Sequence, residues 1–169
     1  MPIKRVLIAV AIFAGCGSSN GLPVQPQIEV SPAGLLFGTD LCLGTWIGTA
    51  PQNDLQILNG GQDPLTITAV TMAAPGVFQM TGPNMILPDG GFQTGLPMTI
   101  QSQQTAFLQV IFQPTAVQKY EGTITVSSNA QNEPALAVPL RGVGVADPVD
   151  GGYVVVDAGI TPDCTGDAG

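Results

Sequence analysis

The chain has 169 residues, which is enough for one domain of ordinary size with one hydrophobic core. It carries 4 lysine and arginine residues against 12 acidic residues, and the net charge of −8 excludes a basic surface for nucleic-acid phosphates. Histidine is absent, which excludes Ser-His-Asp and Cys-His catalysis and His-ligated zinc in their usual forms. We therefore expect no cofactor, no metal, no nucleic acid and no small-molecule substrate.

The first 16 residues, MPIKRVLIAVAIFAGC, have the three parts of a secretion signal. Lys4 and Arg5 form a short basic region, residues 6–13 are apolar, and two small residues precede Cys16. The apolar run is about half of the roughly 20 residues that a membrane-spanning helix needs. We therefore interpret residues 1–15 as a signal peptide and exclude them from the fold.

Residues 13–16, FAGC, resemble the bacterial lipobox, in which cleavage before the cysteine leaves a lipid-modified N-terminus. Ala14, Gly15 and Cys16 match this motif, whereas Phe13 replaces the usual leucine. The resemblance implies lipidation of Cys16 in a signal-cleaved lipoprotein, with acyl chains as the membrane anchor and residues 16–26 as a flexible tether. The alternative is an ordinary signal peptide whose cleavage leaves Cys16 as a thiol.

The resemblance also implies a location in the bacterial cell envelope. Residue 17 is glycine, so the aspartate that retains some Gram-negative lipoproteins at the inner membrane is missing. We therefore expect a protein that is lipid-anchored at the outer membrane and faces the periplasm or the cell surface. Its partner would be another envelope protein.

Most segments from residue 27 onward alternate apolar and polar side chains, which is the pattern of half-buried β-strands. In chain order we expect strands over residues 27–31, 35–38, 54–58, 65–70, 105–114, 122–128 and 135–140. Asn59, Gly60 and Gly61 supply a tight turn between the third and the fourth of these. Glycine and proline interrupt residues 73–95, where the sequence indicates only short strands and loops.

Residues 105–114, TAFLQVIFQP, give the clearest strand signal and should form the centre of a sheet. One face of this strand carries Ala106, Leu108, Val110 and Phe112. Phe107 and Ile111 are apolar residues on the other face, so we expect strands along both edges. Pro139 predicts an edge position or a bulge in the last strand.

This pattern, with no convincing helical period, predicts an all-β fold. We expect an immunoglobulin-like β-sandwich of about seven to nine short antiparallel strands over residues 27–145, with the alternating aliphatic and phenylalanine side chains as its core. Residues 146–169 form an acidic tail rich in glycine and aspartate. Its aspartates lack the spacing of known calcium loops, so a solvated tail is favoured over a calcium site: they are Asp147, Asp150, Asp157, Asp163 and Asp167.

The order of several short segments resembles the ASH/HYDIN-type immunoglobulin-like domain, which belongs with the major-sperm-protein (MSP) and PapD-like sandwiches. Bacterial members of that group occur in secreted "choice-of-anchor D" proteins. The segments are VSP at 30–32, LFG at 36–38, LQILNGG at 55–61, LTI at 65–67, FQP at 112–114, YEGTI at 120–124, SSN at 127–129 and VPLRGVG at 138–144. The resemblance covers about residues 28–144, and residues 42–51 depart from it as an added stretch.

Few residues are candidates for a site. Cys42 and Cys164 would form a disulfide in an oxidising compartment, or Cys42 would remain a buried thiol. Trp46, the only tryptophan, is either a ligand-stacking residue or a partly buried packing residue, and packing is favoured. Asp40, Asp54, Asp63 and Glu121 have spacings that define no acid-base pair.

The sequence thus favours a non-enzymatic, envelope-anchored lipoprotein whose sandwich is a structural or protein-binding module. Its loops or a sheet edge would contact the partner, for example by adding a strand. The alternative is an accessory domain that binds carbohydrate or another envelope polymer through Trp46. An enzyme is disfavoured because histidine is missing and no nucleophile is clustered with a base.

Overall fold

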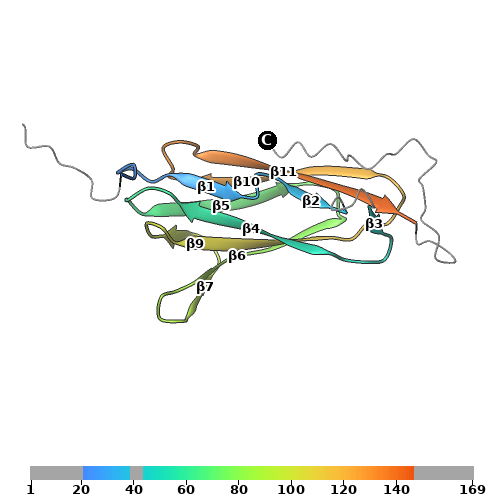
Figure 1. Ribbon diagram of the computed structural model, residues 1–169, viewed down its shortest axis with the longest axis horizontal. Coiled ribbons are helices and arrows are strands. Elements are labelled where there is room, and N and C mark those ends of the chain that lie inside the picture. Colours follow the sequence, from blue (N-terminus) through green and yellow to red (C-terminus); the bar gives the residue numbers. More distant parts are fainter. Residues whose placement is uncertain (1–20, 39–43, 147–169) are drawn as a thin grey trace, which may run out of the picture.

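The computed structural model describes residues 21–38 and 44–146, which form two β-sheets packed into a sandwich (Figure 1). The described residues contain no helix. One sheet has the order β1-β4-β9-β6-β7, and the other has the order β2-β11-β10-β5-β8 with β3 also paired to β11. The strands are β1 (Ile28–Ser31), β2 (Leu35–Phe37), β3 (Thr45–Trp46), β4 (Gln52–Asn59), β5 (Leu65–Ala73), β6 (Phe78–Ile86), β7 (Phe92–Thr94), β8 (Met98–Ile100), β9 (Thr105–Phe112), β10 (Lys119–Ser128) and β11 (Ala135–Val145).

This strand order is that of an immunoglobulin-like sandwich, so the predicted fold class is confirmed. β1, β4, β9 and β6 take the places of strands A, B, E and D, and β5, β10 and β11 take those of C, F and G. The structure has more strands than the seven to nine expected, because β2, β3, β7 and β8 add short pieces of two or three residues. β2 and β3 run parallel to β11, whereas the other pairs are antiparallel.

β9 lies between β4 and β6 in the middle of its sheet, as its sequence predicts. The side chains on its inner face are fully buried, and Phe107 and Ile111 on the outer face are half-buried. Phe112 ends the strand in an aromatic cluster, with its ring centroid 4.8 Å from that of Phe78 and 5.6 Å from that of Tyr120. The core therefore contains a cluster of aromatic rings at the end of β9.

β11 is longer than the predicted strand over residues 135–140. Leu140 to Gly142 pair with β2, and Gly144 and Val145 pair with β3, so neighbours extend the strand to Val145. A Cβ on Gly142 would lie 2.6 Å from Cζ of Phe112, and only glycine fits there. The half of β11 that contains Pro139 pairs with β10 alone, which confirms the expected edge position.

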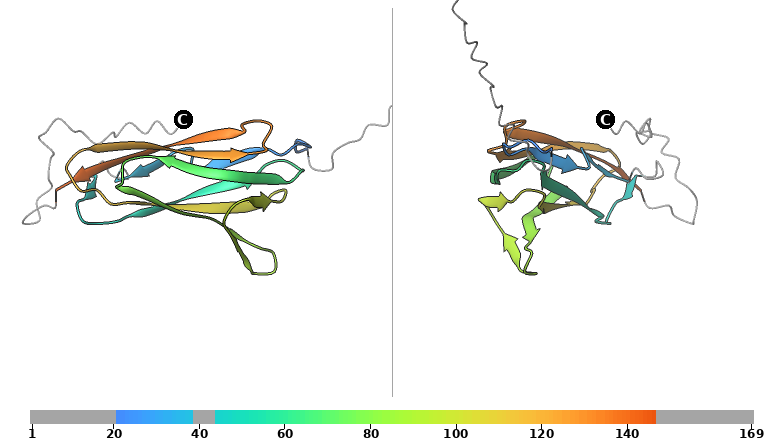
Figure 2. Two further views of the ribbon diagram at one scale, coloured as in Figure 1. Left: turned by 180° about the vertical axis from the view of Figure 1, so that it is seen from behind. Right: turned by 60° about the vertical axis from the view of Figure 1, so that its left-hand side comes forward.

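β6 is a single strand of nine residues where the sequence predicted short strands and loops. The pairing of β6 with β9 changes register between Thr81 and Asn84. Gly82 has a φ of 107°, which places the intervening Gly82-Pro83 step in a bulge. The bulge accommodates the glycine and proline that a regular strand would exclude, and the chain beyond it leaves the sandwich as the β6–β7 hairpin (Figure 2).

The predicted turn after β4 joins two different sheets, because β4 pairs with β1 and β9 whereas β5 pairs with β10 and β8. Asn59 at the end of β4 is fully buried and holds this crossing together. Its Nδ2 donates to the carbonyls of Asp63 (2.8 Å) and Ile100 (3.0 Å), and its Oδ1 accepts from the Gly61 amide (2.9 Å). The asparagine is therefore a structural residue with all its polar side-chain atoms bonded.

Residues 22–26 are bonded to the sandwich, although the sequence assigned residues 16–26 to a flexible tether. The amides of Gln62 and Asp63 donate to the carbonyls of Pro23 (2.9 Å) and Val24 (2.8 Å). A Cβ on Gly61 would collide with the Gln25 carbonyl, so the close approach requires glycine. Residues 22–26 therefore belong to the described domain.

Candidate binding surface at one end of the sandwich

Trp46 lies at one end of the long axis, on a short strand whose backbone is firmly held (Figure 1). β3 pairs with the last residues of β11, and the amide of Ile47 donates to the Val145 carbonyl (3.0 Å). The carbonyl of Trp46 accepts hydrogen bonds from the amide (3.1 Å) and from Oγ1 (2.7 Å) of Thr49. The indole nevertheless keeps 50% of its surface exposed. A fixed backbone thus presents a half-exposed aromatic side chain.

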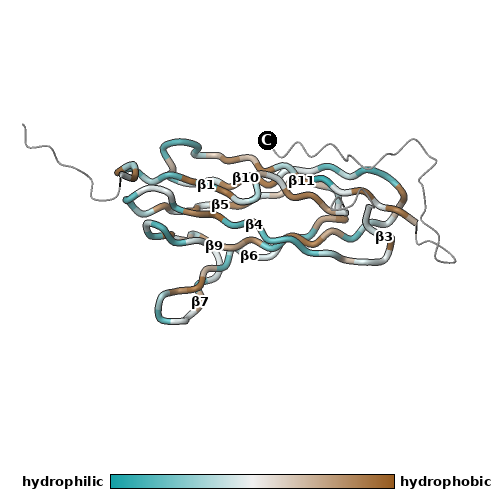
Figure 3. Tube along the Cα trace, in the orientation of Figure 1, coloured by the Kyte–Doolittle hydropathy of each residue, from teal (hydrophilic) through white to brown (hydrophobic). Residues whose placement is uncertain are grey.

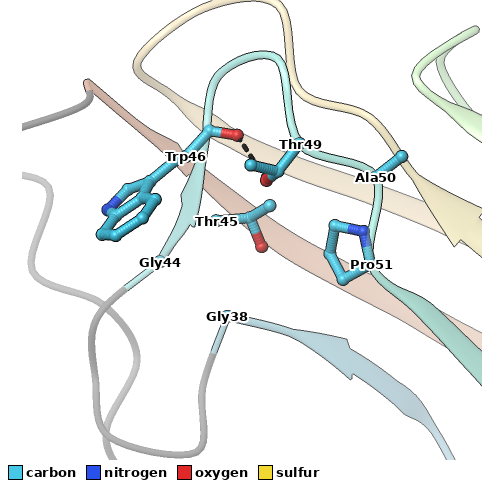
Figure 4. A pocket seen from close by; sticks show the side chains of 7 residues that line it. All are labelled: Gly38, Gly44, Thr45, Trp46, Thr49, Ala50 and Pro51. Atoms are coloured by element: carbon cyan, nitrogen blue, oxygen red, sulfur yellow. Dashed lines mark hydrogen bonds between the residues drawn. The ribbon is translucent and has the colours of Figure 1, made fainter.

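An open cleft of about 520 Å³ lies beside Trp46. Figure 4 shows the indole on one side of the cleft, Ala50 and Pro51 on the other, and Thr45 between them. None of the lining residues is charged; they are Gly38, Gly44, Thr45, Trp46, Thr49, Ala50 and Pro51. Among the described residues, the cleft therefore offers an aromatic face and two hydroxyl groups, and no ionisable group lines it.

Two glycines form the floor of the cleft. The amide of Gly44 donates to the carbonyl of Gly38 (2.7 Å), which brings the ends of β2 and β3 together. Gly44 has a φ of 59°, and a Cβ there would collide with the side chain of Val145. The sequence indicated a glycine-rich loop around Trp46, but the long-range pairing with β11 that shapes the cleft has no local signal.

Two further exposed aliphatic side chains lie in segments that bond to the end of β11, and together with Trp46 and the cleft they define what we call the Trp46 end. Ile47 and Val117 are each 38% exposed. Val117 belongs to the β9–β10 loop, which is joined to this end because the Gly144 amide donates to the Gln118 carbonyl (2.9 Å). Neither residue was predicted from the sequence, since alternation does not show whether a lone aliphatic side chain is exposed.

Tyr120 fixes the β9–β10 loop beneath this surface. Its hydroxyl accepts a hydrogen bond from the Ala116 amide (3.0 Å) and donates one to the Ala116 carbonyl (3.3 Å). A tyrosine at the start of strand F that bonds to the backbone a few residues upstream is the tyrosine corner of immunoglobulin-like sandwiches. Val117 therefore directly follows Ala116, a residue whose backbone is fixed by the Tyr120 hydroxyl.

The other sequence candidates do not converge on a site. Asp54 lies on β4 and accepts a hydrogen bond from Gln109 Nε2 (3.4 Å), Glu121 lies on β10 of the other sheet, and Asp63 is in the β4–β5 loop. Cys16, Asp40, Cys42, Cys164 and the five tail aspartates lie outside the described residues. Within residues 21–38 and 44–146, no group of three histidine, cysteine or acidic residues is placed to hold a metal ion. The same residues contain no helix long and apolar enough to cross a membrane.

Comparison with known proteins gives likenesses in structure only. No protein-family model and no curated protein matches the sequence. The ASH/PapD-like domain 7 of human CEP192 is 16% identical with a TM-score of 0.47, and the match covers 87% of this chain and all of that domain. WR4, an MSP family member of C. elegans, is 11% identical with a TM-score of 0.39 over 72% of this chain and 98% of that one.

The periplasmic chaperone SfaE is 10% identical with a TM-score of 0.45 over 72% of this chain, and the match spans 58% of the chaperone. All these scores are below 0.5, so the assignment of the fold rests on strand order and register within the chain itself. The strand order shows that the chain is an all-β protein with an immunoglobulin-like sandwich. The comparisons show that this sandwich is similar to ASH, MSP and PapD-like domains.

Proposed function

We propose that this protein is a lipid-anchored component of a bacterial cell envelope, and that its sandwich is a non-enzymatic module that binds another envelope protein at the Trp46 end. The anchor would be the lipid on Cys16, and residues 17–21 would be the tether. The mechanism is presentation, since a rigid domain holds a binding surface at a distance from the membrane without chemical change to the partner.

The observation that carries this proposal is the position of the two ends of the domain. The chain enters the sandwich at the loop that follows β4, where the Gly60 amide donates to the Gln27 carbonyl (3.0 Å). Trp46 lies at the opposite end of the long axis (Figure 1). The eleven residues of β11 run along that axis, and at about 3.3 Å per residue they span roughly 35 Å. An anchored domain would therefore carry Trp46 and the cleft beside it far from the attachment point.

The composition of the Trp46 end suits a protein partner. Tryptophan is among the residues that contribute most to protein interfaces, particularly where aliphatic neighbours exclude water from it. Trp46, Ile47 and Val117 are a tryptophan and two aliphatic side chains that are exposed at this end. The backbone beneath them is bonded to β11, so little order would have to be gained on binding.

Carbohydrate is the second candidate ligand, and the cleft beside Trp46 favours it. An aromatic ring packs against the apolar face of a sugar, and the hydroxyl groups of Thr45 and Thr49 line the same cleft. Cavities of this size hold small ligands, and about 520 Å³ has room for one or two sugar rings. This candidate requires the cleft, whereas Ile47 and Val117 lie outside its lining.

The first experiment tests the anchor. The intact mass of the protein purified from cell envelopes should equal that of residues 16–169 plus a lipid-modified cysteine. Cys16→Ser should abolish the modification and release the protein from membranes. A mature chain that begins elsewhere and carries no lipid would contradict the anchor while leaving the binding surface open to test.

The second experiment separates the two ligands. Trp46→Ala should reduce binding of either ligand at least tenfold, because it removes the aromatic face. Ile47→Gln and Val117→Gln should weaken capture of a protein partner from solubilised envelopes but leave glycan-array binding within about twofold of wild type. Val24→Gln is the matched control, since Val24 is also exposed but lies in the segment that enters the sandwich before β1. Equal loss of capture in Val24→Gln would contradict a specific role for the Trp46 end.

A further inference from the structure

The β6–β7 hairpin projects from the side of the sandwich, and we call residues 83–95 the arm (Figures 1 and 2). At its tip, the amide of Leu87 donates to the carbonyl of Gly91 (2.8 Å), and Oδ1 of Asp89 accepts from the Gly91 amide (2.9 Å). At its base, Gly82 lies in the bulge where the register with β9 shifts. The arm is thus a hydrogen-bonded hairpin that begins at the bulge and points away from the sandwich.

Two large apolar side chains lie next to each other on the arm. Ile86 and Phe92 are directly opposite partners in the β6–β7 pairing, so both point to the same face of the hairpin. Their side chains are 58% and 74% exposed, and Phe92 is the most exposed large hydrophobic residue in the described part of the chain. Hydrophobic residues continue from the sandwich out along the arm in Figure 3. The arm therefore carries an apolar patch that the domain itself does not cover.

The charge of the arm restricts what can cover this patch. Asp89 is the only charged residue within residues 83–95, so the arm has no cation with which to pair an acidic partner or an anionic headgroup. An aromatic and an aliphatic side chain with almost no neighbouring charge suit the boundary between headgroups and acyl chains of a zwitterionic bilayer.

The length of chain before the domain also favours a bilayer as the occupant. This step rests on the proposed lipid anchor. Leu22 is six residues after Cys16, and six residues span at most about 21 Å, so the anchor would hold the domain close to the membrane surface. The arm leaves the sandwich in the half that is nearer to the chain entry than to β3 (Figures 1 and 2).

We propose that Ile86 and Phe92 insert into the surface of the phospholipid bilayer that holds the anchor, and that the arm thereby fixes the orientation of the sandwich. Two side chains are too small a contact to hold a free protein at a membrane. For an anchored protein the effective concentration at the surface is high, and a weak contact is enough to select one orientation. The Trp46 end would then stay in the aqueous phase.

The test uses the lipidated protein in vesicles of phosphatidylethanolamine and phosphatidylcholine that contain lipids brominated near the headgroup end of the acyl chains. The double variant Trp46→Phe/Phe92→Trp has one fluorescent reporter on the arm. The wild-type protein, with Trp46 as its only tryptophan, is the matched control. We expect the brominated lipids to reduce emission of the arm reporter at least twofold and to change that of Trp46 by less than a tenth. Adding Ile86→Ser to the double variant should weaken the quenching.

Thermal unfolding of each variant checks that it is folded before the vesicle measurement, and flotation with the vesicles reports the anchor independently. A protein that floats but whose arm reporter is not quenched would overturn this inference and leave the anchor intact. Failure to float would overturn both. Equal quenching of the reporters at positions 92 and 46 would also refute the insertion of the arm. Self-association of the protein that Ile86→Ser abolishes would refute it as well, because a second copy would then cover the arm.

Discussion

The two ends of the sandwich are built from different chemistry. At the end where the chain enters, amide side chains bond to backbone groups, and Asn59 is fully buried with three hydrogen bonds. At the Trp46 end, a tryptophan and two aliphatic side chains face solvent above a bonded backbone. The first end is thus occupied by bonds that maintain the fold, whereas the second leaves apolar side chains exposed.

The largest effect should come from Asn59→Ala. The substitution leaves two carbonyls and one amide without their partners in a buried position, and we expect a loss of about 3 kcal/mol in the free energy of unfolding. For a domain of this size that corresponds to a fall in Tm of roughly 10 °C. Denaturant titration measures the first quantity and calorimetry the second.

Asn53→Ala is the control for that experiment, because Asn53 is on the same strand and donates a single exposed hydrogen bond, from Nδ2 to the Leu36 carbonyl (2.8 Å). It should cost no more than about 1 kcal/mol. Equal destabilisation by the two substitutions would show that burial of Asn59 has no special role.

Tyr120→Phe should have the next largest effect. It removes the hydroxyl that bonds to both backbone groups of Ala116 but keeps the ring against Phe112, so we expect a loss of about 1.5 kcal/mol. Urea unfolding monitored by circular dichroism measures it. A stability equal to that of wild type would mean that water replaces the hydroxyl and that the β9–β10 loop is held by other contacts.

Asn132→Ala tests the entry end at an exposed position. The Asn132 side chain accepts from the Ile28 amide (2.9 Å) and donates to the Ile28 carbonyl (2.8 Å), so it acts as a substitute strand partner for the start of β1. We expect a loss of about 1 kcal/mol and faster hydrogen exchange at the Ile28 amide. If the amide exchanged at the wild-type rate, the side chain would not contribute to the order of β1.

Thr49→Val should give the smallest effect. The hydroxyl of Thr49 donates to the Trp46 carbonyl at an exposed position, so its loss should change stability by about 0.5 kcal/mol or less. Binding at the Trp46 end should fall only a few-fold, because the indole remains. A tenfold loss of binding with unchanged stability would instead indicate that the hydroxyl contacts the ligand itself.

Alternation in the sequence predicted the sandwich well where the core alone decides the structure. In β9 every second side chain is fully buried, and Ile124 and Val126 of β10 are buried as well. The position of Pro139, on the half of β11 that pairs with β10 alone, also followed from a local rule, since proline cannot donate to a ladder.

Long-range pairing decided the features that the sequence did not predict. The turn at Asn59 had the sequence of a hairpin turn between two paired strands. In the structure it connects β4 of one sheet to β5 of the other, and the Asn59 side chain bonds to the carbonyls of Asp63 and Ile100 at this crossing. β6 contains Gly82 and Pro83, which ordinarily end a strand, and it continues because a bulge accommodates them. β2 and β3 depend on the end of β11, about 100 residues away along the chain.

The candidate surface was predicted in part. Trp46 was named from its rarity and its glycine-rich surroundings, with packing favoured over ligand contact, and it is half exposed. Ile47, Val117 and the pair on the arm were not named, because aliphatic and aromatic residues in a sandwich are usually core. Their exposure depends on where loops and hairpin leave the sheets.

Site-specific photo-crosslinking in intact cells tests whether the Trp46 end binds another envelope protein. A photoreactive amino acid is placed at Ile47 or Val117 of the Trp46 end, or at exposed Asp63 of the entry end. We predict that both positions of the Trp46 end crosslink to the same envelope protein, that Trp46→Ala abolishes the product, and that position 63 does not yield it. Crosslinking of that protein from position 63 alone, or equally from all three positions, would show that the Trp46 end is not the binding surface.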